Sequence, residues 1–340
     1  MTAPDRVTIS LDEVRAVLNA GLREAGLEPD EVPVVAAHLL ACELRGFHSG
    51  GIARLLSIAH RLSEKRRPRD PVRIVREGPS SAAVDGGDRV GYLVGQFATD
   101  LAVRKAGETG LALVGASRTW YTGMLSYYAE QLTRRGFVAL IASNATPWVA
   151  PHGGTEGRFG TNPFCVGFPS SDGADVVWDI GTSATTHASV ELARRTGKSL
   201  DEGLALGPDG APTVDPATAL AGTLLSWGGA RGSGLAMVVQ LLGVMAGSPV
   251  APGELEDFGM VIAAWDPGLL RPAADGFGDR VREYSQWVRA TRPADGSEVR
   301  MPFDRTRRVR EAILARGTLE IEREVLDAVR ALAYPTAGPA

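Results

Sequence analysis

The sequence has few of the features that mark specialised classes of protein. It contains two cysteines, Cys42 and Cys165, which lie far apart in apolar surroundings. Two buried thiols are therefore expected, in place of a disulfide or a metal site, and they suit a reducing compartment. The 36 basic and 40 acidic side chains are interspersed and leave a net charge of -4. No basic stripe is available for phosphates, so nucleic acid is not an expected partner.

The sequence also lacks clear export and membrane signals. Its first residues do not show the basic and then apolar pattern of a signal peptide, so a cytoplasmic protein is expected. The most apolar stretch, residues 232–250, approaches the length of a membrane span. Its glycines, together with Ser233 and Gln240, favour a buried helix in a large core. No membrane partner is expected.

Two common nucleotide-binding signatures are missing as well. The chain has neither a G-x-G-x-x-G fingerprint nor a Walker loop. The usual sequence routes to a Rossmann dinucleotide site and to a P-loop are therefore absent. Any nucleotide site in this protein has to be built in another way.

Helical segments are predicted at both ends of the chain. Of the 340 residues, 44% are hydrophobic, which is enough for a large core. Apolar spacing predicts one helix from the capping box Ser10–Glu13, a second after Pro29 and a third over 52–62. Residues 66–73 are polar and contain two prolines, so they are expected to end this unit. A last helix is predicted over 318–332.

Between these helical ends the pattern is that of an α/β protein. Short apolar runs that predict strands alternate with stretches of helical spacing. Strands are expected at 82–84, 111–114, 138–141, 164–168 and 176–178, and helices at 94–106, 127–134 and 188–195. Residues 147–160 and 203–216 are rich in glycine and proline. Loops of that length in a compact domain are often functional.

Six short motifs occur in a fixed order along the chain. They are RGFHSGGIARL at 45–55, AAVDG at 82–86 with glycines at 91 and 95, GG and GTNP within 153–163, DIGTS at 179–183, the stretch 220–234 that ends GGARGSG, and MPFDR at 301–305. In this order they resemble the motifs of the type-2 malate/L-lactate dehydrogenase-like family, whose members reduce 2-oxo or cyclic 2-imino acids with NAD(P)H. The family includes sulfolactate, ureidoglycolate and diketogulonate dehydrogenases and piperideine-2-carboxylate reductase.

This resemblance implies a fold, a cofactor and an assembly. The fold is α/β, with a non-Rossmann mixed sheet of the sulfolactate dehydrogenase type and helical amino- and carboxy-terminal segments. The implied domains are a helical one (1–75 with 290–340), a central sheet (76–120 with 240–289) and a cofactor-binding one (121–239). The implied cofactor is NADPH or NADH, the implied partner is a small-molecule substrate, and a homodimer is expected.

The expected catalytic positions depart from the family pattern. Where the family carries the histidine of S-H-G, this chain has Gly50, which cannot transfer a proton. His48 is a candidate for a displaced acid, and the alternative is a loop histidine bonded to solvent. A second family histidine corresponds to Tyr121, whose phenol can donate a proton. A packed aromatic is the alternative there.

The remaining site residues also follow from the resemblance. The candidates for substrate binding are Ser49, Arg54, Arg118 and His152, of which His152 could be structural. The candidates for cofactor binding are Asn162, Asp179, Thr182, Ser183, Arg231, Asp304 and Arg305. Arg231 keeps the positive charge of a family triplet, with an exposed surface arginine as the alternative. Asp179 could instead cap a helix, and His187, at a helix start, has no clear role.

Three functions are compatible with this pattern. The first is an NAD(P)H-dependent reductase of a small 2-imino or 2-oxo acid, which explains the retained cofactor motifs. A cyclic imine is favoured because a protonated imine already carries its proton, so it needs a general acid less than a ketone does. The second is a family scaffold diverted to non-redox biosynthetic chemistry, which explains the lost histidine. The third is a protein that only binds a nucleotide or metabolite.

Overall fold

The centre of the molecule is a twisted mixed sheet. The computed structural model describes residues 5–64, 69–270, 272, 276–294 and 296–335, and within them the sheet has seven strands in the order β2-β3-β4-β11-β5-β6-β7. The strands are β2 (Arg73–Glu77), β3 (Ser81–Val90), β4 (Leu111–Trp120), β11 (Phe258–Trp265), β5 (Val138–Ser143), β6 (Phe164–Phe168) and β7 (Val176–Ile180). Only β3 and β4 pair in parallel. The predicted mixed α/β fold is confirmed.

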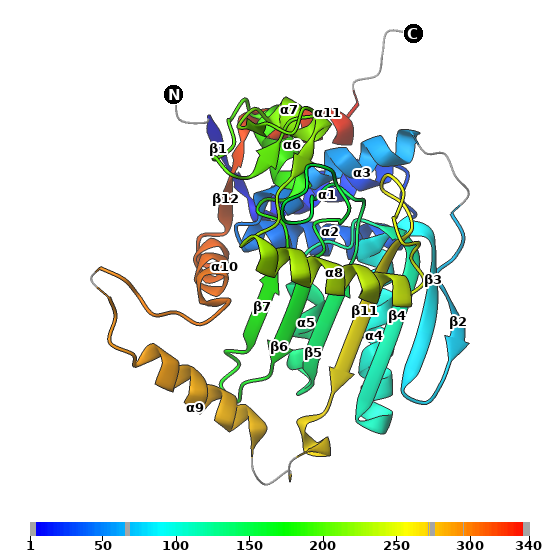
Figure 1. Ribbon diagram of the computed structural model, residues 1–340, viewed down its shortest axis with the longest axis vertical. Helices are drawn as coiled ribbons and strands as arrows, with labels where there is room; N and C mark the ends of the chain where they lie inside the picture. The colour runs from blue at the N-terminus through cyan, green and yellow to red at the C-terminus, as the bar shows by residue number, and fades with distance from the viewer. Residues whose placement is uncertain (1–4, 65–68, 271, 273–275, 295, 336–340) are drawn as a thin grey trace.

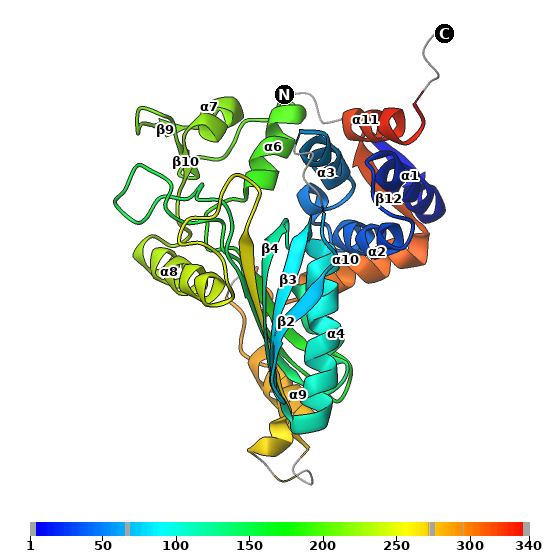
Figure 2. The same cartoon turned by 90° about the vertical axis from the view of Figure 1, so that its right-hand side faces the viewer.

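Helices cover the two faces of this sheet unequally (Figure 2). The crossover helix α4 (Gly91–Thr109) packs on one face against alternate residues of β4 such as Val114, and α5 (Ser126–Thr133) packs on that face against β5 and β6. The other face carries α8 (Ala230–Met245), which leaves the β4 residues Leu111 and Leu113 more than 40% exposed.

The helical unit brings the two ends of the chain together (Figure 1). Its elements are β1 (Arg6–Ser10), α1 (Leu11–Glu24), α2 (Glu31–Leu44), η1 (His48–Gly50), α3 (Ile52–Glu64), α10 (Asp304–Arg316), β12 (Thr318–Glu322) and α11 (Arg323–Ala333). β1 and β12 form an antiparallel pair. The predicted cap of the first helix is confirmed, because the Ser10 hydroxyl accepts a hydrogen bond from the Glu13 amide at 3.1 Å.

The helix predicted over 318–332 is partly wrong. Residues Thr318–Glu322 form strand β12, and the helix begins only at Arg323. Leu319 and Ile321 are both buried and lie two residues apart, which is the period of a strand. Their apolar spacing also fits a helix, and pairing with β1 decides between the two.

A small lobe stands beside the helical unit, above the same end of the sheet (Figure 2). It contains α6 (His187–Arg195), β8 (Ala205–Leu206), β9 (Pro212–Thr213), α7 (Pro216–Ala221) and β10 (Thr223–Leu224). Its own core includes Val149, Phe159 and Val190. At the opposite end of the molecule lie η2 (Pro267–Leu269) and α9 (Phe277–Arg289).

The strands and helices predicted for the α/β region are all present, and most are longer than predicted. The α-helices and strands without a predicted counterpart are β1, β2, β8, β9, β10, β11, α7, α9 and α10. The sheet crosses the predicted boundary at residue 120, because β5, β6 and β7 pair in the same sheet as β4. The division into three domains therefore remains a proposal. Of the predicted boundary segment 66–73, residues 66–68 lie outside the described part of the chain.

The prediction of a buried helix within 232–250 is wrong in one respect. α8 buries Ala236 and Val239, but its outward face is apolar and exposed. Met237, Val238, Leu241 and Met245 are 50–67% exposed. Within the described residues, no helix is long and apolar enough to cross a membrane. Monomeric proteins rarely expose an apolar face of this kind.

Candidate active site

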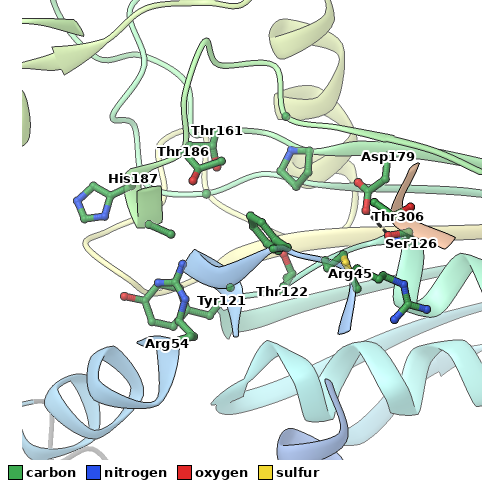
Figure 3. A pocket seen from close by; sticks show the side chains of 18 of the residues that line it. Arg45, Arg54, Tyr121, Thr122, Ser126, Thr161, Asp179, Thr186, His187 and Thr306 are labelled. Carbon is green, nitrogen blue, oxygen red and sulfur yellow. Dashed lines mark hydrogen bonds between the residues drawn. The ribbon is translucent and has the colours of Figure 1, made fainter. Parts of the chain in front are cut away.

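A cavity of about 470 Å³ lies where the sheet, the helical unit and the small lobe meet. Its walls come from segments far apart in the sequence, which Figure 3 shows from close by. They are the loop before α3, the turn after β4, the end of β7, and the first turns of α6 and α10. Among the predicted site residues, Arg54, Tyr121, Asp179 and Arg305 line the cavity.

The turn after β4 is held in one conformation. Tyr121 has a φ of +51°, and Gly123 has a φ of +79°. A non-glycine residue in this region costs about 1–3 kcal/mol and persists where its surroundings impose it. The contact that holds this turn comes from buried His38, whose Nε2 accepts a hydrogen bond from the Met124 amide at 3.0 Å. Burial lowers the pKa of His38 to about 3, so it stays neutral and available as an acceptor.

Arg54 places an unpaired positive charge in the cavity wall. It comes from the first turn of α3, and its guanidinium carbon lies 4.2 Å from the centre of the Tyr121 ring. With the described residues it forms no ion pair and no side-chain hydrogen bond, and its Nε is buried without a partner. A half-buried cation without a counter-ion is unfavourable unless a ligand supplies the negative charge.

The neighbouring Arg45 is different, because its charge is already neutralised. Its Nη2 donates to both carboxylate oxygens of Glu130, at 2.6 and 2.7 Å. Figure 3 shows its side chain turned away from Arg54. Of these two cavity arginines, only Arg54 is available to an anionic ligand.

Gly50 lines the cavity, and an aromatic ring fills the space beside it. A Cβ atom added at Gly50 would lie 2.3 Å from Cε1 of Phe47. The ring of Phe47 thus occupies the volume into which a side chain at position 50 would project. This ring makes that part of the cavity apolar, at the position where the family resemblance implies an imidazole.

His48 and Ser49 do not line the cavity. His48 Nδ1 lies 2.7 Å from Oε2 of buried Glu43, while Oε1 of that carboxylate accepts from the Ile52 amide, also at 2.7 Å. The Glu43 hydrogen bond raises the pKa of His48, with smaller opposed effects from burial and Arg6. The pair therefore ties the loop before α3 to the end of α2. Ser49 contacts the Ser189 hydroxyl at 3.2 Å.

Asp179 faces the cavity and also caps a helix (Figure 3). Its Oδ2 accepts from the Ser126 amide, at the start of α5, at 2.7 Å. Burial raises the pKa of Asp179. The capped helix is α5, which precedes Asp179 in the sequence.

Three predicted cofactor residues lie behind the cavity wall and support it. Thr182 donates to the Thr161 carbonyl from its amide and its hydroxyl. Asn162 donates to the Ala236 carbonyl at 2.9 Å and so ties its loop to α8. Ser183 is buried, and its hydroxyl has no partner within the described residues.

Four other predicted residues lie away from the cavity. Arg118 donates to both oxygens of Asp85, at 2.8 and 3.0 Å. Asp304 accepts from Arg289 at 2.8 Å. His152 and Arg231 are exposed. Arg231 and Asp179 therefore do not share this cavity.

The sequence reasoning missed several lining residues, of which His187 is the clearest. This side chain lies at the first position of α6, where Thr186 caps the helix by accepting from the Ser189 amide at 3.0 Å. Its ring stacks on Trp148, with centroids 3.9 Å apart and planes 19° apart. Burial, and then Arg54, lower the pKa of His187 to about 4. The only sequence signal was its place at a predicted helix start.

The cavity suits the flat end of a nicotinamide cofactor. Trp148 and Phe303 contribute aromatic surface, and Thr161 and Thr186 are further lining residues. Arg305 is exposed at the cavity and forms no hydrogen bond with the described residues. A free guanidinium at this position can pair with a phosphate. The residues present therefore fit the cofactor that the sequence motifs imply.

Known proteins resemble this chain over most of its length. The family model for malate/L-lactate dehydrogenase matches residues 9–330. The chain is 33% identical to the Delta(1)-pyrroline-2-carboxylate reductase of Ancylobacter novellus over 237 residues, 69% of this chain and 70% of that protein. The structure of a Sinorhizobium meliloti dehydrogenase matches with a TM-score of 0.88 and 29% identity, covering 97% of this chain and 99% of the other.

A second similar structure is that of a reductase of a cyclic imino acid. It is the delta1-piperideine-2-carboxylate reductase of Pseudomonas syringae, with a TM-score of 0.82 and 27% identity. The match covers 96% of this chain and 99% of the other. These structures bear out the expected fold class.

The His48–Glu43 pair predicts a pH-dependent stability. Because folding raises the pKa of His48, its stabilising effect is complete below the unfolded pKa and is lost as pH rises through the folded pKa. We expect His48→Gln to lower the free energy of unfolding more at about pH 5.5 than at about pH 8.5, measured by urea denaturation. His60→Gln, at an exposed histidine of α3, is the control. An equal loss at both pH values contradicts the pairing.

Proposed function

We propose that this chain, which belongs to the malate/L-lactate dehydrogenase family, reduces a small cyclic 2-imino acid in the cavity, with NADH or NADPH. Family membership makes it an oxidoreductase. Its relatives are dehydrogenases and reductases of small hydroxy or imino acids. The substrate, the choice of cofactor and the residue roles below are our proposal, as is a cytoplasmic location.

The observation that carries the proposal is the unpaired guanidinium of Arg54. It lies in a cavity of small-molecule size and has no acidic partner within the described residues. A planar guanidinium binds a carboxylate through two parallel hydrogen bonds. The contact with the Tyr121 ring, 4.2 Å from the guanidinium carbon, restrains this group. Arg54 would therefore hold the carboxylate of the substrate. The imine carbon, which is bonded to this carboxylate, would then lie over the turn after β4.

The apolar surroundings of Gly50 favour an imine over a ketone. When bound, a reduced nicotinamide supplies a hydride, which adds to the imine carbon while the C=N π electrons become the amine lone pair and the iminium proton stays on nitrogen. A ketone needs a proton donor for the alkoxide that develops on its oxygen. Phe47, which fills the space beside Gly50, supplies none. A protonated imine needs none.

A 2-oxo acid is the second candidate, and Tyr121 is the observation that favours it. Its side chain lines the cavity beside Arg54 (Figure 3). A phenol can donate a proton to a developing alkoxide. His48, the other acid considered from the sequence, lies outside the cavity wall. Tyr121 is therefore the proton donor that we assign to ketone reduction.

The first test is cofactor binding, followed by turnover. The purified protein is titrated with NADH and with NADPH, and nicotinamide fluorescence and thermal stabilisation are recorded. Saturable binding of one of them is expected. Five- and six-membered cyclic 2-imino acids are then compared with the matching 2-oxo acids. Binding of neither cofactor contradicts the reductase and favours a scaffold diverted to non-redox chemistry or to binding alone.

Arg54 and Arg118 provide a matched pair of arginine variants. We expect Arg54→Met to raise KM for the substrate about 10- to 100-fold, because a hydrogen-bonded charge is lost. Arg118→Met removes the same charge outside the cavity, where Asp85 is its partner. It is expected to change KM by less than about twofold. Equal effects in steady-state kinetics would contradict Arg54 as the carboxylate anchor.

Tyr121→Phe separates the two candidate substrates. General acid catalysis contributes about 10²- to 10⁴-fold, so the variant should lose about that much kcat/KM with a 2-oxo acid. With a cyclic imino acid the loss should stay below about tenfold, because the iminium brings its own proton. Cofactor affinity, measured by fluorescence, is the control for misfolding. A loss that is equally large for both substrates contradicts the assigned role.

We also propose that the chain forms a homodimer through the exposed face of α8. Met237, Val238, Leu241 and Met245 form an exposed apolar row on α8, and Leu111 and Leu113 of β4 are exposed as well. A contiguous apolar surface of this kind usually lies in an interface. A second copy would bury the row and the bare sheet face together.

If this face forms the interface, a charge placed on it should prevent the dimer. Leu241→Glu places a charge on the exposed α8 face and should give a monomer, measured by light scattering, at a concentration where the unchanged protein is a dimer. Leu314→Glu, at an exposed leucine of α10, is the control and should remain dimeric. A dimer in both variants would place the interface elsewhere.

A further inference from the structure

His187 is a cavity residue whose ring nitrogens are free. It lines the cavity, and within the described residues neither ring nitrogen has a hydrogen-bond partner. Figure 3 shows the imidazole on the opposite side of the cavity from Arg54 and Tyr121. A ligand held by Arg54 would therefore lie between these side chains and His187.

Two contacts fix the position of this imidazole. Its ring lies flat against Trp148, 3.9 Å between centroids. Its backbone begins α6, because the Thr186 hydroxyl caps the helix. A ring held by stacking and by a capped helix loses little further freedom when it binds a ligand. The geometry is thus already set for one hydrogen bond into the cavity.

The charges around His187 keep it neutral. Burial and the positive Arg54 lower its pKa to about 4, against a smaller opposite effect of Glu191. The amino-terminal end of α6 also disfavours a positive charge. A neutral imidazole has one donor and one acceptor nitrogen and gives up its N–H proton poorly. His187 is therefore a poor acid for a ketone and a suitable acceptor for a cationic donor.

We propose that His187 accepts a hydrogen bond from the N–H of the substrate's iminium group and so selects imino acids over oxo acids. This assignment rests on the proposed reductase function. A hydrogen bond from a charged donor is about twice as strong as a neutral one. The imine nitrogen and the carboxylate are both bonded to C2 of a 2-imino acid, so Arg54 and His187 would hold adjacent groups of one small molecule.

A pair of ligands tests the assignment without turnover. Pyrrole-2-carboxylate and furan-2-carboxylate are both flat, and only the first has a ring N–H. With the oxidised cofactor bound, we expect calorimetry to show about tenfold tighter binding of the pyrrole compound, as for one hydrogen bond. His187→Phe keeps the stack on Trp148 but has no acceptor, and it should abolish the preference. His187→Gln keeps an acceptor and should retain most of it.

Two results would overturn the role of His187. One is a protein that binds both ligands equally. The other is a His187→Phe variant that keeps the preference. Cofactor affinity should stay within about twofold in both variants. A large change in that affinity, with the preference intact, would assign His187 to the cofactor.

Turnover distinguishes this assignment from the reductase proposal itself. His187→Phe should lower kcat/KM for a cyclic imino acid about 10- to 100-fold, as for a lost charge-assisted hydrogen bond. For a 2-oxo acid the change should be about threefold or less, as for a weak neutral contact. If the unchanged protein reduces neither kind of acid, the reductase proposal fails, and the ligand pair still decides whether His187 recognises an N–H group.

Discussion

The charge of Arg54, which is unpaired within the described part of the chain, is the constraint on which the site depends. A half-buried guanidinium tolerates the loss of water only if its surroundings compensate for it. Here the Tyr121 ring compensates in part, and the remaining donors are left for a ligand. The same charge helps to keep His187 neutral across the cavity. One cation thus provides an anchor for an anion and sets the protonation state of the group that faces it.

The rest of the fold holds the partners of Arg54 in place. Tyr121 reaches its ring position from a left-handed backbone conformation, which His38 stabilises by binding the Met124 amide. Arg45 also lines the cavity, but Glu130 neutralises its charge, so it does not compete for a carboxylate. The sheet contributes Asp179, whose carboxylate caps α5. Arg45 and Asp179 are therefore satisfied by the protein, whereas Arg54, His187 and the exposed Arg305 have no hydrogen-bond partner within the described residues.

Sequence patterns predicted helices and strands well where the apolar period was clear. They predicted the contacts of side chains poorly, because those contacts depend on segments elsewhere in the sequence. The α/β core followed from short apolar runs, whereas Leu319 and Ile321 fitted two periods and were resolved only by pairing with β1. Motif order brought Arg54 and Tyr121 forward as site residues. It gave Arg118 the same standing, because nothing local reveals that Asp85 neutralises it. The sequence placed His187 at the start of a predicted helix, but its place in the cavity depends on the Trp148 stack, a tertiary contact without a local signature.

The loop before α3 shows how the site can change without loss of the fold. Glu43 binds His48 with one oxygen and the first amide of α3 with the other, so the loop is anchored on its outer side. On its inner side Phe47 occupies the space beside Gly50. Because the anchor does not involve position 50, an imidazole there is not needed for folding. The aromatic ring beside position 50 adds apolar surface to the cavity and offers no proton donor. That combination suits a protonated imine, which already carries its proton. Recognition of this substrate then depends on Arg54 as the carboxylate anchor and on His187 as the hydrogen-bond acceptor.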